Sequence, residues 1–284
     1  MCATCGCSEG AVRVSGEHRD DHDHGLGHTH DHGHDHDHGH AHDHGHDHDH
    51  GHGEPHTHVE TNVGTTTTRV IQLEQDILAK NDLLATRNRD WFADRGILAL
   101  NLMSSPGAGK TTLLERTIRD VGSELGISVV EGDQETLLDA DRIEATGCSA
   151  VQINTGSGCH LDAEMLERGL RVLQPADRSV VMIENVGNLV CPALFDLGER
   201  AKVVIMSVTE GADKPLKYPQ MFRAAGLMLL NKVDLCPYVD FDTARCASYA
   251  QQVNPALTVL EVSATRGDGL DAWYSWLRTQ RDTP

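Results

Sequence analysis

The chain has 284 residues and a formal net charge of −19 at pH 7, which allows one substantial domain with extensions. Residues 1–64 contain 2 Arg, no Lys and 13 acidic residues, a charge of −11, which leaves −8 for the remainder. Neither part is basic, so we expect no nucleic acid partner. There is no apolar run of about 18 residues and no signal peptide core, so we expect a cytoplasmic protein without membrane contact.

The first eight residues contain three closely spaced cysteines, Cys2, Cys5 and Cys7. In a reducing compartment such thiols are more often metal ligands or redox groups than disulfides. Three thiolates with the α-amine or a backbone nitrogen can form the square-planar set that suits Ni²⁺. A redox cluster or a fragment of a zinc knuckle is the alternative. We predict a metal motif over residues 1–8.

Residues 18–58 form a tract of His, Asp and Gly that holds 18 of the 19 histidines. This tract has too few apolar residues to offset its ordering entropy, so we predict that residues 9–68, the tract and a linker, are disordered without metal. Alternating imidazole and carboxylate groups should bind several Ni²⁺, Zn²⁺ or Cu²⁺ ions with modest discrimination. The alternative is an acidic tail that only keeps the protein soluble, but the large number of histidines disfavours this alternative.

The pattern changes to that of a folded domain at Arg69. Apolar residues at near-helical spacing predict an amphipathic helix over residues 69–96. Residues 97–284 then alternate between strand and helix patterns, which predicts an α/β fold with a mostly parallel sheet flanked by helices. The predicted strands are Ile97–Met103, Ser128–Glu131, Ala150–Ile153, Ser179–Glu184, Lys202–Val208, Leu227–Asn231 and Thr258–Val262, and the last helix is Leu270–Arg281. Ligands of such sheets bind beyond the carboxyl ends of the strands.

A glycine-rich turn follows the first of these strands and opens a helix. It reads S-S-P-G-A-G-K-T over residues 104–111, and it departs from the phosphate-loop consensus G-x-x-x-x-G-K-[ST] only in Ser104. Its glycines let backbone N–H groups surround phosphate oxygens, Lys110 can reach the β- and γ-phosphates, and Thr111 can bind Mg²⁺. An ordinary turn is the alternative. We predict a P-loop NTPase fold whose nucleotide contacts come from Ser105, Gly107, Ala108, Gly109, Lys110, Thr111 and Thr112.

A second motif, N-K-V-D from Asn231 to Asp234, follows a later strand. The Asp234 carboxylate can accept hydrogen bonds from the N1–H and the exocyclic amine of guanine, whereas adenine offers neither donor there. Four polar residues after a strand are often only a loop, but in combination with a phosphate loop they become specific. Ser263-Ala264 after the next strand resembles a third guanine-contacting loop. We predict that Asn231, Lys232, Asp234, Ser263 and Ala264 bind the base of GTP or GDP.

Two acidic residues, Asp133 and Glu184, end strands on the side where the nucleotide would lie. Mg²⁺ prefers carboxylate and hydroxyl oxygens, so these residues and Thr111 are its candidate ligands. Residues 184–187, E-N-V-G, have the D-x-x-G shape of a phosphate-sensing switch. Solvated strand-end acids are the alternative. Asn188 stands where Ras-like proteins have a water-positioning Gln, so we expect slow hydrolysis. The candidate catalytic residues are Lys110, Asp133, Glu184 and Gly187.

A second candidate metal site lies within the domain. Cys159 and His160 sit in the loop after Ala150–Ile153, and Cys191 lies seven residues after Glu184. Three ligands make an incomplete site, which a water or a second subunit across a two-fold axis could complete. Metal geometry would then depend on nucleotide state. Ordinary buried cysteines and a loop histidine are the alternative.

The sequence resembles the HypB-type hydrogenase nickel-incorporation GTPases, of the SIMIBI class of P-loop proteins, over nearly its whole length. The resemblance rests on C-A-T-C-G-C, the His-rich insert, L-A-K-N-D-x-x-A-T-R-N-R-x-W-F, N-L-M-S-S-P-G-A-G-K-T-T-L-L-E, I-E-N-V-G-N-L-V-C-P, T-E-G-A-D-K-P-L-K-Y-P and N-K-V-D. It implies a nucleotide-controlled homodimer that delivers Ni²⁺ to the precursor of the [NiFe]-hydrogenase large subunit with a HypA-type nickel and zinc protein. The family's N-terminal nickel site maps onto Cys2, Cys5 and Cys7, and its nickel or zinc site onto Cys159, His160 and Cys191.

Two other functions remain open from the sequence. A urease-type nickel accessory GTPase has a similar domain, although the N-terminal cysteines and the Cys159, His160 and Cys191 arrangement disfavour it. The second alternative is a nickel reservoir with a vestigial nucleotide site. The intact set of Lys110, Thr111 and Asp234 disfavours this function.

Overall fold

The computed structural model describes residues 13–14, 63–133, 138–156 and 158–283. Cys2, Cys5, Cys7 and the His-rich tract lie outside this part of the chain, so the predictions made for them stay predictions. In α1 the side chains are described from Gln75 onward.

Within the described residues, one sheet of eight strands forms the centre of the domain, with the order β1-β4-β3-β5-β2-β6-β7-β8. Seven strands are parallel, and β1 pairs with β4 in the antiparallel direction. The strands are β1 (Arg13–Val14), β2 (Leu98–Ser104), β3 (Ile127–Asp133), β4 (Ser149–Asn154), β5 (Val180–Glu184), β6 (Ala201–Ser207), β7 (Leu227–Asn231) and β8 (Thr258–Glu261). The mostly parallel α/β sheet predicted from the sequence is confirmed, and the bounds of the seven predicted strands differ by up to two residues. The short strand β1 was not predicted, because it lies within residues 9–68, where we expected disorder.

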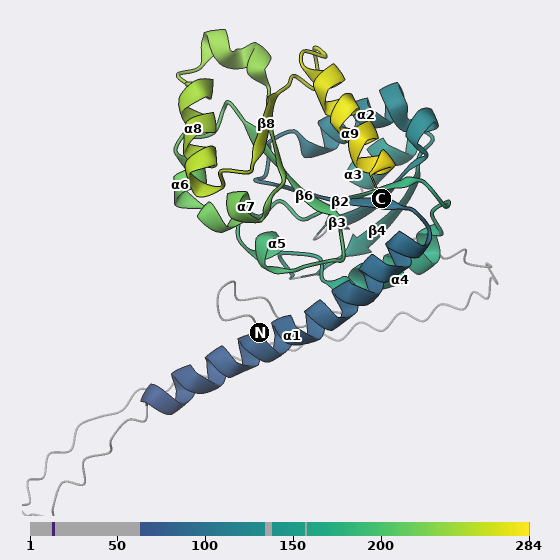
Figure 1. Cartoon of the computed structure of the whole chain (residues 1–284), viewed down its shortest axis with the longest axis vertical. Coiled ribbons are helices and arrows are strands. Elements are labelled where there is room, and N and C mark those ends of the chain that lie inside the picture. Colours follow the sequence, from purple (N-terminus) through teal and green to yellow (C-terminus); the bar gives the residue numbers. More distant parts are fainter. Residues whose placement is uncertain (1–12, 15–62, 134–137, 157, 284) are drawn as a thin grey trace, which may run out of the picture.

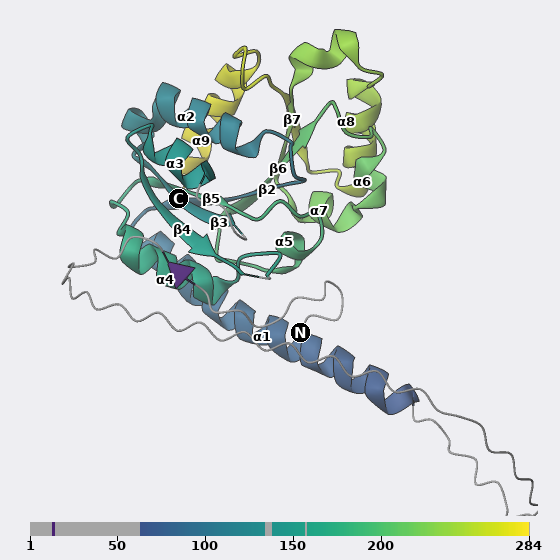
Figure 2. The same ribbon diagram turned by 180° about the vertical axis from the view of Figure 1, so that it is seen from behind.

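Helices cover both faces of this sheet (Figures 1 and 2). The helices are α1 (Val63–Asp94), α2 (Lys110–Leu125), α3 (Leu138–Glu144), α4 (Ala163–Leu173), α5 (Cys191–Leu194), α6 (Lys214–Lys217), α7 (Pro219–Ala224), α8 (Thr243–Val253) and α9 (Leu270–Asp282), with a 3₁₀ helix, η1 (Val233–Tyr238). Core residues from α2, α3 and α9 pack on one face. On the other face α1 and α4 cover one half of the sheet, and α7 and α8 cover the other.

The side chains of β2 alternate between the two faces of the sheet and therefore pack into the core on both of them. Leu98, Leu100 and Leu102 enter the core under α2 and α9, whereas Ala99 lies under α1 and α4 and Met103 under α7 and α8. Successive side chains of a strand point to opposite faces, so a strand covered on both sides reads as a continuous apolar run. β2 is fully buried in this way, and it ends where the phosphate loop begins.

The long helix α1 extends away from the body of the domain at its N-terminal end (Figure 1). It begins at Val63, so residues 63–68, which we predicted to be linker, are helical. No glycine or proline interrupts residues 65–95, and an existing helix adds further residues at low cost. The C-terminal half packs closely on the domain, because a Cβ atom on Gly198 would lie 2.5 Å from the carbonyl oxygen of Ala85.

Candidate functional site

The phosphate loop connects the end of β2 to the start of α2. Gly107 and Gly109 have φ angles of 75° and 91°, in the left-handed region that side chains disfavour. A Cβ atom on Gly109 would lie 2.6 Å from Asn231 Nδ2, so this position also requires a residue without a side chain. The turn therefore has the backbone curvature that a phosphate-binding loop needs, followed directly by a helix N-terminus.

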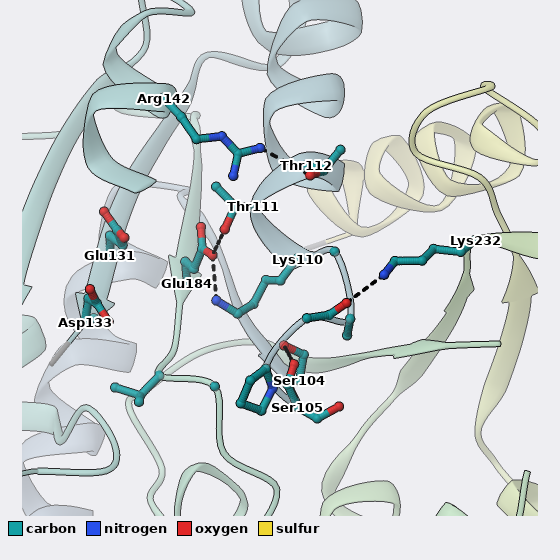
Figure 3. Close-up of a pocket in the computed structure, with 17 residues that line it drawn as sticks. Ser104, Ser105, Lys110, Thr111, Thr112, Glu131, Asp133, Arg142, Glu184 and Lys232 are labelled. Atoms are coloured by element: carbon teal, nitrogen blue, oxygen red, sulfur yellow. Dashed lines mark hydrogen bonds and ion pairs between the residues drawn. The ribbon is translucent and has the colours of Figure 1, made fainter. Parts of the chain in front are cut away.

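A cavity of about 540 Å³ opens above this loop (Figure 3). Its lining contains the whole loop, the ends of β3 and β5, and one side chain each from α3 and the N-K-V-D segment. The lining residues include Ser104, Ser105, Gly107, Ala108, Gly109, Lys110, Thr111, Thr112, Asp133, Arg142, Glu184, Gly187 and Lys232. Residues predicted from four separate sequence segments thus share one cavity.

Glu184 lies at the centre of the charged groups in this cavity. Its Oε1 accepts hydrogen bonds from Lys110 Nζ at 2.5 Å and from Thr111 Oγ1 at 2.7 Å, and the side chain is almost fully buried. Glu184 Oε2 is buried and has no hydrogen-bond partner in the part of the chain that the structure describes. A buried carboxylate oxygen without a donor is costly, and a cation can satisfy it. Glu184, Thr111 and Asp133 therefore fit Mg²⁺, which prefers such hard oxygen ligands.

Gly187 lies against the phosphate loop. A Cβ atom there would be 3.3 Å from the backbone nitrogen of Pro106. The segment after β5 is therefore held close to the phosphate loop, as expected for a residue that offers its N–H to a γ-phosphate.

A second, smaller pocket beside the loop has the features expected of a base-binding site. It is lined by Gly109, Thr112, Asn231, Lys232, Asp234, Leu235, Ala264 and Thr265. Asn231 joins two of these segments, because its Nδ2 donates to the Ala108 carbonyl at 3.0 Å and its Oδ1 accepts from the Ala264 N–H at 3.1 Å. Ser263 Oγ donates to Asp234 Oδ1 at 2.6 Å, which orients the carboxylate.

Lys232 connects this pocket to the phosphate loop. Its Nζ donates to the Gly107 carbonyl at 2.7 Å, and its backbone has a left-handed φ of 63°. The N-K-V-D segment is therefore attached to the loop at two points, Asn231 and Lys232.

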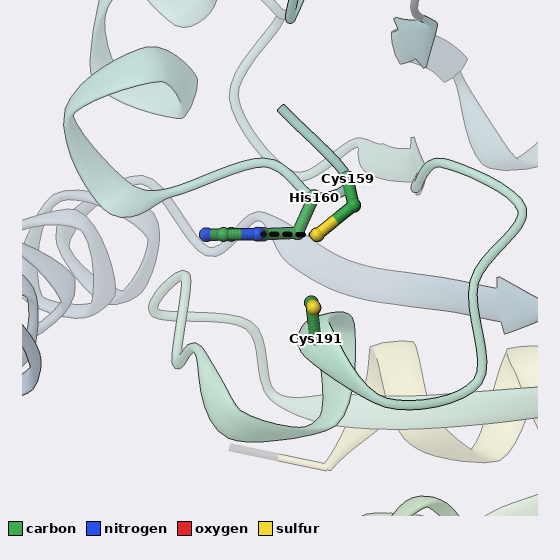
Figure 4. Close-up of side chains that lie close together, drawn as sticks. All are labelled: Cys159, His160 and Cys191. Carbon is green, nitrogen blue, oxygen red and sulfur yellow. Dashed lines mark hydrogen bonds between the residues drawn. The ribbon is translucent and has the colours of Figure 1, made fainter. Parts of the chain in front are cut away.

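The candidate inner metal site is also assembled (Figure 4). One ligand atom each from Cys159, His160 and Cys191 lie within 4.8 Å of one another. Cys159 Sγ is 3.5 Å from His160 Nδ1, and the His160 ring stacks on Phe195 at a centroid distance of 3.9 Å. Both cysteines are buried. Two thiols and an imidazole are a donor set that suits Ni²⁺ or Zn²⁺.

Burial of the His160 imidazole lowers its pKa below the usual value, against an opposing effect from the Asp162 carboxylate. A lowered pKa favours the neutral form of the ring, which is the form that binds a metal ion.

Several contacts in the site were not predicted from the sequence. Glu210 and Lys214, which follow β6, both contact Ser105 of the phosphate loop, and Lys214 Nζ is 3.2 Å from its Oγ. Arg142 of α3 donates to Thr112 Oγ1 at 3.2 Å. Asn185, the second residue of the switch segment 184–187, has a fully buried side chain. Glu210 and Lys214 belong to the motif T-E-G-A-D-K, which contributes to the family resemblance but whose pattern alone indicates no role for either residue.

Parallel strands, a phosphate loop and a base pocket beside it define a P-loop nucleotide-binding protein. The sequence model of the CobW/HypB/UreG nucleotide-binding domain matches residues 98–261. Among similar proteins, hydrogenase maturation factor HypB of Azotobacter vinelandii is 49% identical over 283 residues, covering 100% of this chain and 93% of that protein. HypB of Escherichia coli K12 is 47% identical, covering 99% of both chains.

Two solved structures of HypB proteins are similar to this fold. HypB of Archaeoglobus fulgidus has a TM-score of 0.68 at 40% identity, covering 72% of this chain and 100% of that one. HypB of Helicobacter pylori, solved in complex with nickel, has a TM-score of 0.67 at 38% identity, covering 71% and 95%. The chain belongs to the HypB family of P-loop proteins. No helix in the described residues is long and apolar enough to cross a membrane.

Proposed function

We propose that this protein is a GTP-hydrolysing nickel metallochaperone, which stores Ni²⁺ and delivers it to the precursor of the [NiFe]-hydrogenase large subunit. One observation carries the proposal. Cys159, His160 and Cys191 converge within 4.8 Å on loops that follow β4 and β5, and the β5 strand also ends in Glu184 at the phosphate loop. Because the carboxyl ends of parallel strands meet at one edge of the sheet, nucleotide and metal bind at the same edge.

Guanine selection follows from the carboxylate of Asp234. The guanine base offers two donors to it, and adenine would leave it without a partner. Asn231 and Lys232 hold this segment on the phosphate loop. Ala264 lines the base pocket, and Ser263, which is not among the lining residues, orients the Asp234 carboxylate.

Hydrolysis rests on positioning and charge around the phosphates. Lys110 would leave Glu184 for the β- and γ-phosphates, and Gly187 would offer its N–H to the γ-phosphate. Mg²⁺, held by Thr111, Glu184 and Asp133, would supply charge neutralisation at the phosphate oxygens. We expect slow turnover, because Asn188 replaces a water-positioning Gln.

The inner metal site takes Ni²⁺ or Zn²⁺ on two thiolates and a neutral imidazole. A fourth ligand comes from water or from a second copy of the chain, since three ligands leave a coordination position open. A homodimer whose two-fold axis passes near Cys191 would pair two such sites.

Storage is assigned to residues 18–58, and the first nickel acceptor to Cys2, Cys5 and Cys7. A HypA-type nickel and zinc protein and the hydrogenase precursor are the proposed partners in the cytoplasm. The names of the relatives support this choice over a urease-only role, although HypB of Helicobacter hepaticus, 45% identical over 62% of this chain, is named as a hydrogenase and urease maturation factor.

Two variants separate the two activities. Lys110→Ala should abolish GTP turnover and leave bound nickel unchanged, whereas Cys191→Ala should lose one nickel equivalent and still bind GTP. Lys217→Ala is the matched control, because Lys217 is an exposed lysine paired with Asp213 at 2.8 Å. A wild-type protein that turns over no GTP with Ni²⁺ and its partner present would favour the reservoir function. Capture of urease maturation partners alone would favour the urease-type function.

A further inference from the structure

A chain of buried polar side chains connects the two loops of the inner metal site behind the nucleotide switch. Its members are Asn101, Asn185, Glu199 and Lys202, and the first three are among the buried polar residues of the domain. Buried polar groups need partners, and a fully paired network favours one arrangement of the segments it joins.

Asn185 is the member that contacts the metal loop. Its Oδ1 accepts from the backbone N–H of Leu161, the residue after His160, at 3.1 Å, and from the Val186 N–H at 3.0 Å. Its Nδ2 donates to Asn101 Oδ1 at 3.2 Å, and its backbone N–H donates to the Leu102 carbonyl at 3.1 Å. One fully buried carboxamide thus joins the His160 loop, the switch and the strand that leads into the phosphate loop.

The other end of the network holds the helix that carries Cys191. Asn101 Nδ2 donates to Glu199 Oε1 at 3.1 Å, and Lys202 Nζ lies 3.6 Å from the same oxygen. Lys202 Nζ also reaches the carbonyls of Pro192, Ala193 and Phe195, at 3.4, 3.1 and 3.0 Å. Those carbonyls belong to α5 and the residue after it, and α5 begins at Cys191.

Asn185 is also the direct neighbour of Glu184, which contacts Lys110 and Thr111. A triphosphate competes with Glu184 for the Lys110 ammonium, so the backbone at residues 184–187 responds to the nucleotide. A shift of this backbone moves the Asn185 carboxamide, because only a few side-chain torsions separate the carboxamide from the backbone. The Leu161 N–H, and with it His160, must follow or lose a buried hydrogen bond.

We propose that Asn185 is the positioning residue that transmits the nucleotide state to the Cys159, His160 and Cys191 site. This inference rests on the proposed function, in which nucleotide and nickel are coupled. The rest of the network keeps Cys191 in place while the His160 loop moves, so the separation of the ligands changes.

The test uses the full chain with Ni²⁺ as the probe. Absorption of the nickel–thiolate bonds is titrated with GDP and with a non-hydrolysable GTP analogue bound, and the same titration of Cys191→Ala is subtracted to remove the signal from other ligands. The ratio of the two nickel dissociation constants measures the coupling, and coupled sites typically give about 5- to 150-fold. In Asn185→Ala this ratio should fall to within about twofold of one.

Asn185→Asp should also lower the ratio, because a carboxylate still accepts from Leu161 and Val186 but cannot donate to Asn101 Oδ1. Asn254→Ala is the matched control, since Asn254 is a structural amide that donates to the Phe222 and Ala225 carbonyls, remote from the switch. If Asn185→Ala does not fold, Asn101→Ala breaks the same network one bond away and should also lower the ratio.

The outcomes distinguish a failure of this inference from a failure of the proposed function. A wild-type ratio that Asn185→Ala or Asn101→Ala leaves unchanged overturns the role of Asn185, and coupling itself stands. A wild-type ratio of one removes the coupling of the proposed function, and the inference with it.

Discussion

The base pocket allows a quantitative prediction for Asp234→Asn. In the structure Ser263 Oγ donates to Asp234 Oδ1 at 2.6 Å, which leaves the remaining lone pairs of the carboxylate for the two donors of guanine. In the variant the single amide oxygen stays with Ser263, and an NH₂ group that cannot accept faces the base. Loss of a charge-assisted acceptor costs roughly 2–3 kcal/mol. GTP and GDP affinity should therefore fall by roughly 30- to 140-fold.

The assay is equilibrium titration with a fluorescent guanine nucleotide in the presence of Mg²⁺. Asp240→Asn is the matched control, because Asp240 is exposed and lies outside the base pocket. Xanthosine triphosphate provides an independent check, since its base has a carbonyl oxygen in place of the exocyclic amine. Asp234→Asn should bind it more tightly than the wild type does. Unchanged GTP affinity in Asp234→Asn would refute the assignment of this pocket to the base.

Three further predictions concern the tail, the core and the half-buried thiol of Cys148. Deleting residues 18–58 should lower the nickel stoichiometry severalfold and leave GTP turnover unchanged, and a loss of turnover would mean that the tail is not an independent module. Trp273→Phe should lower the free energy of unfolding by about 2–3 kcal/mol in denaturant titration, because the indole is buried and donates to Thr117 Oγ1 at 3.0 Å; an effect below about 0.5 kcal/mol would contradict this packing. Burial raises the pKa of the Cys148 thiol from 9.0 to about 11. Its alkylation in the folded protein should therefore rise with pH up to about 11, whereas a midpoint near 9 is expected only in denaturant.

Much of the sheet could be predicted because its strands are buried on both faces. Apolar runs such as Leu227–Leu230 between turns are typical of parallel strands, and the predicted strands lie within two residues of the observed ones. The predicted start of α1 at residue 69 was wrong, because the helix begins at Val63. The threonines at residues 65–68 have weak helix propensity, so their sequence did not indicate a helix, although α1 continues through them.

The candidate nucleotide and metal residues could be predicted because each motif is local in sequence. Among the described residues, most of these candidates lie in one cavity, one adjacent pocket and one Cys-His-Cys cluster, whereas Cys2, Cys5 and Cys7 lie outside that part of the chain. The polar network behind them has no local pattern. Asn101 interrupts an apolar strand, and its partners Asn185 and Glu199 are 84 and 98 residues away in sequence. Only the folded sheet shows that these groups are paired.

In the proposed function, the binding free energies of nucleotide and of nickel at one edge of the sheet are coupled. The most direct measurement determines this coupling in both directions: nickel affinity of the inner site with GDP and with a GTP analogue, and the affinities of both nucleotides with and without Ni²⁺. Linkage requires the two ratios to be equal. We expect the two ratios to be equal and to differ from one in the wild type, and both to equal one in Cys191→Ala. Ratios of one in the wild type would contradict this coupling.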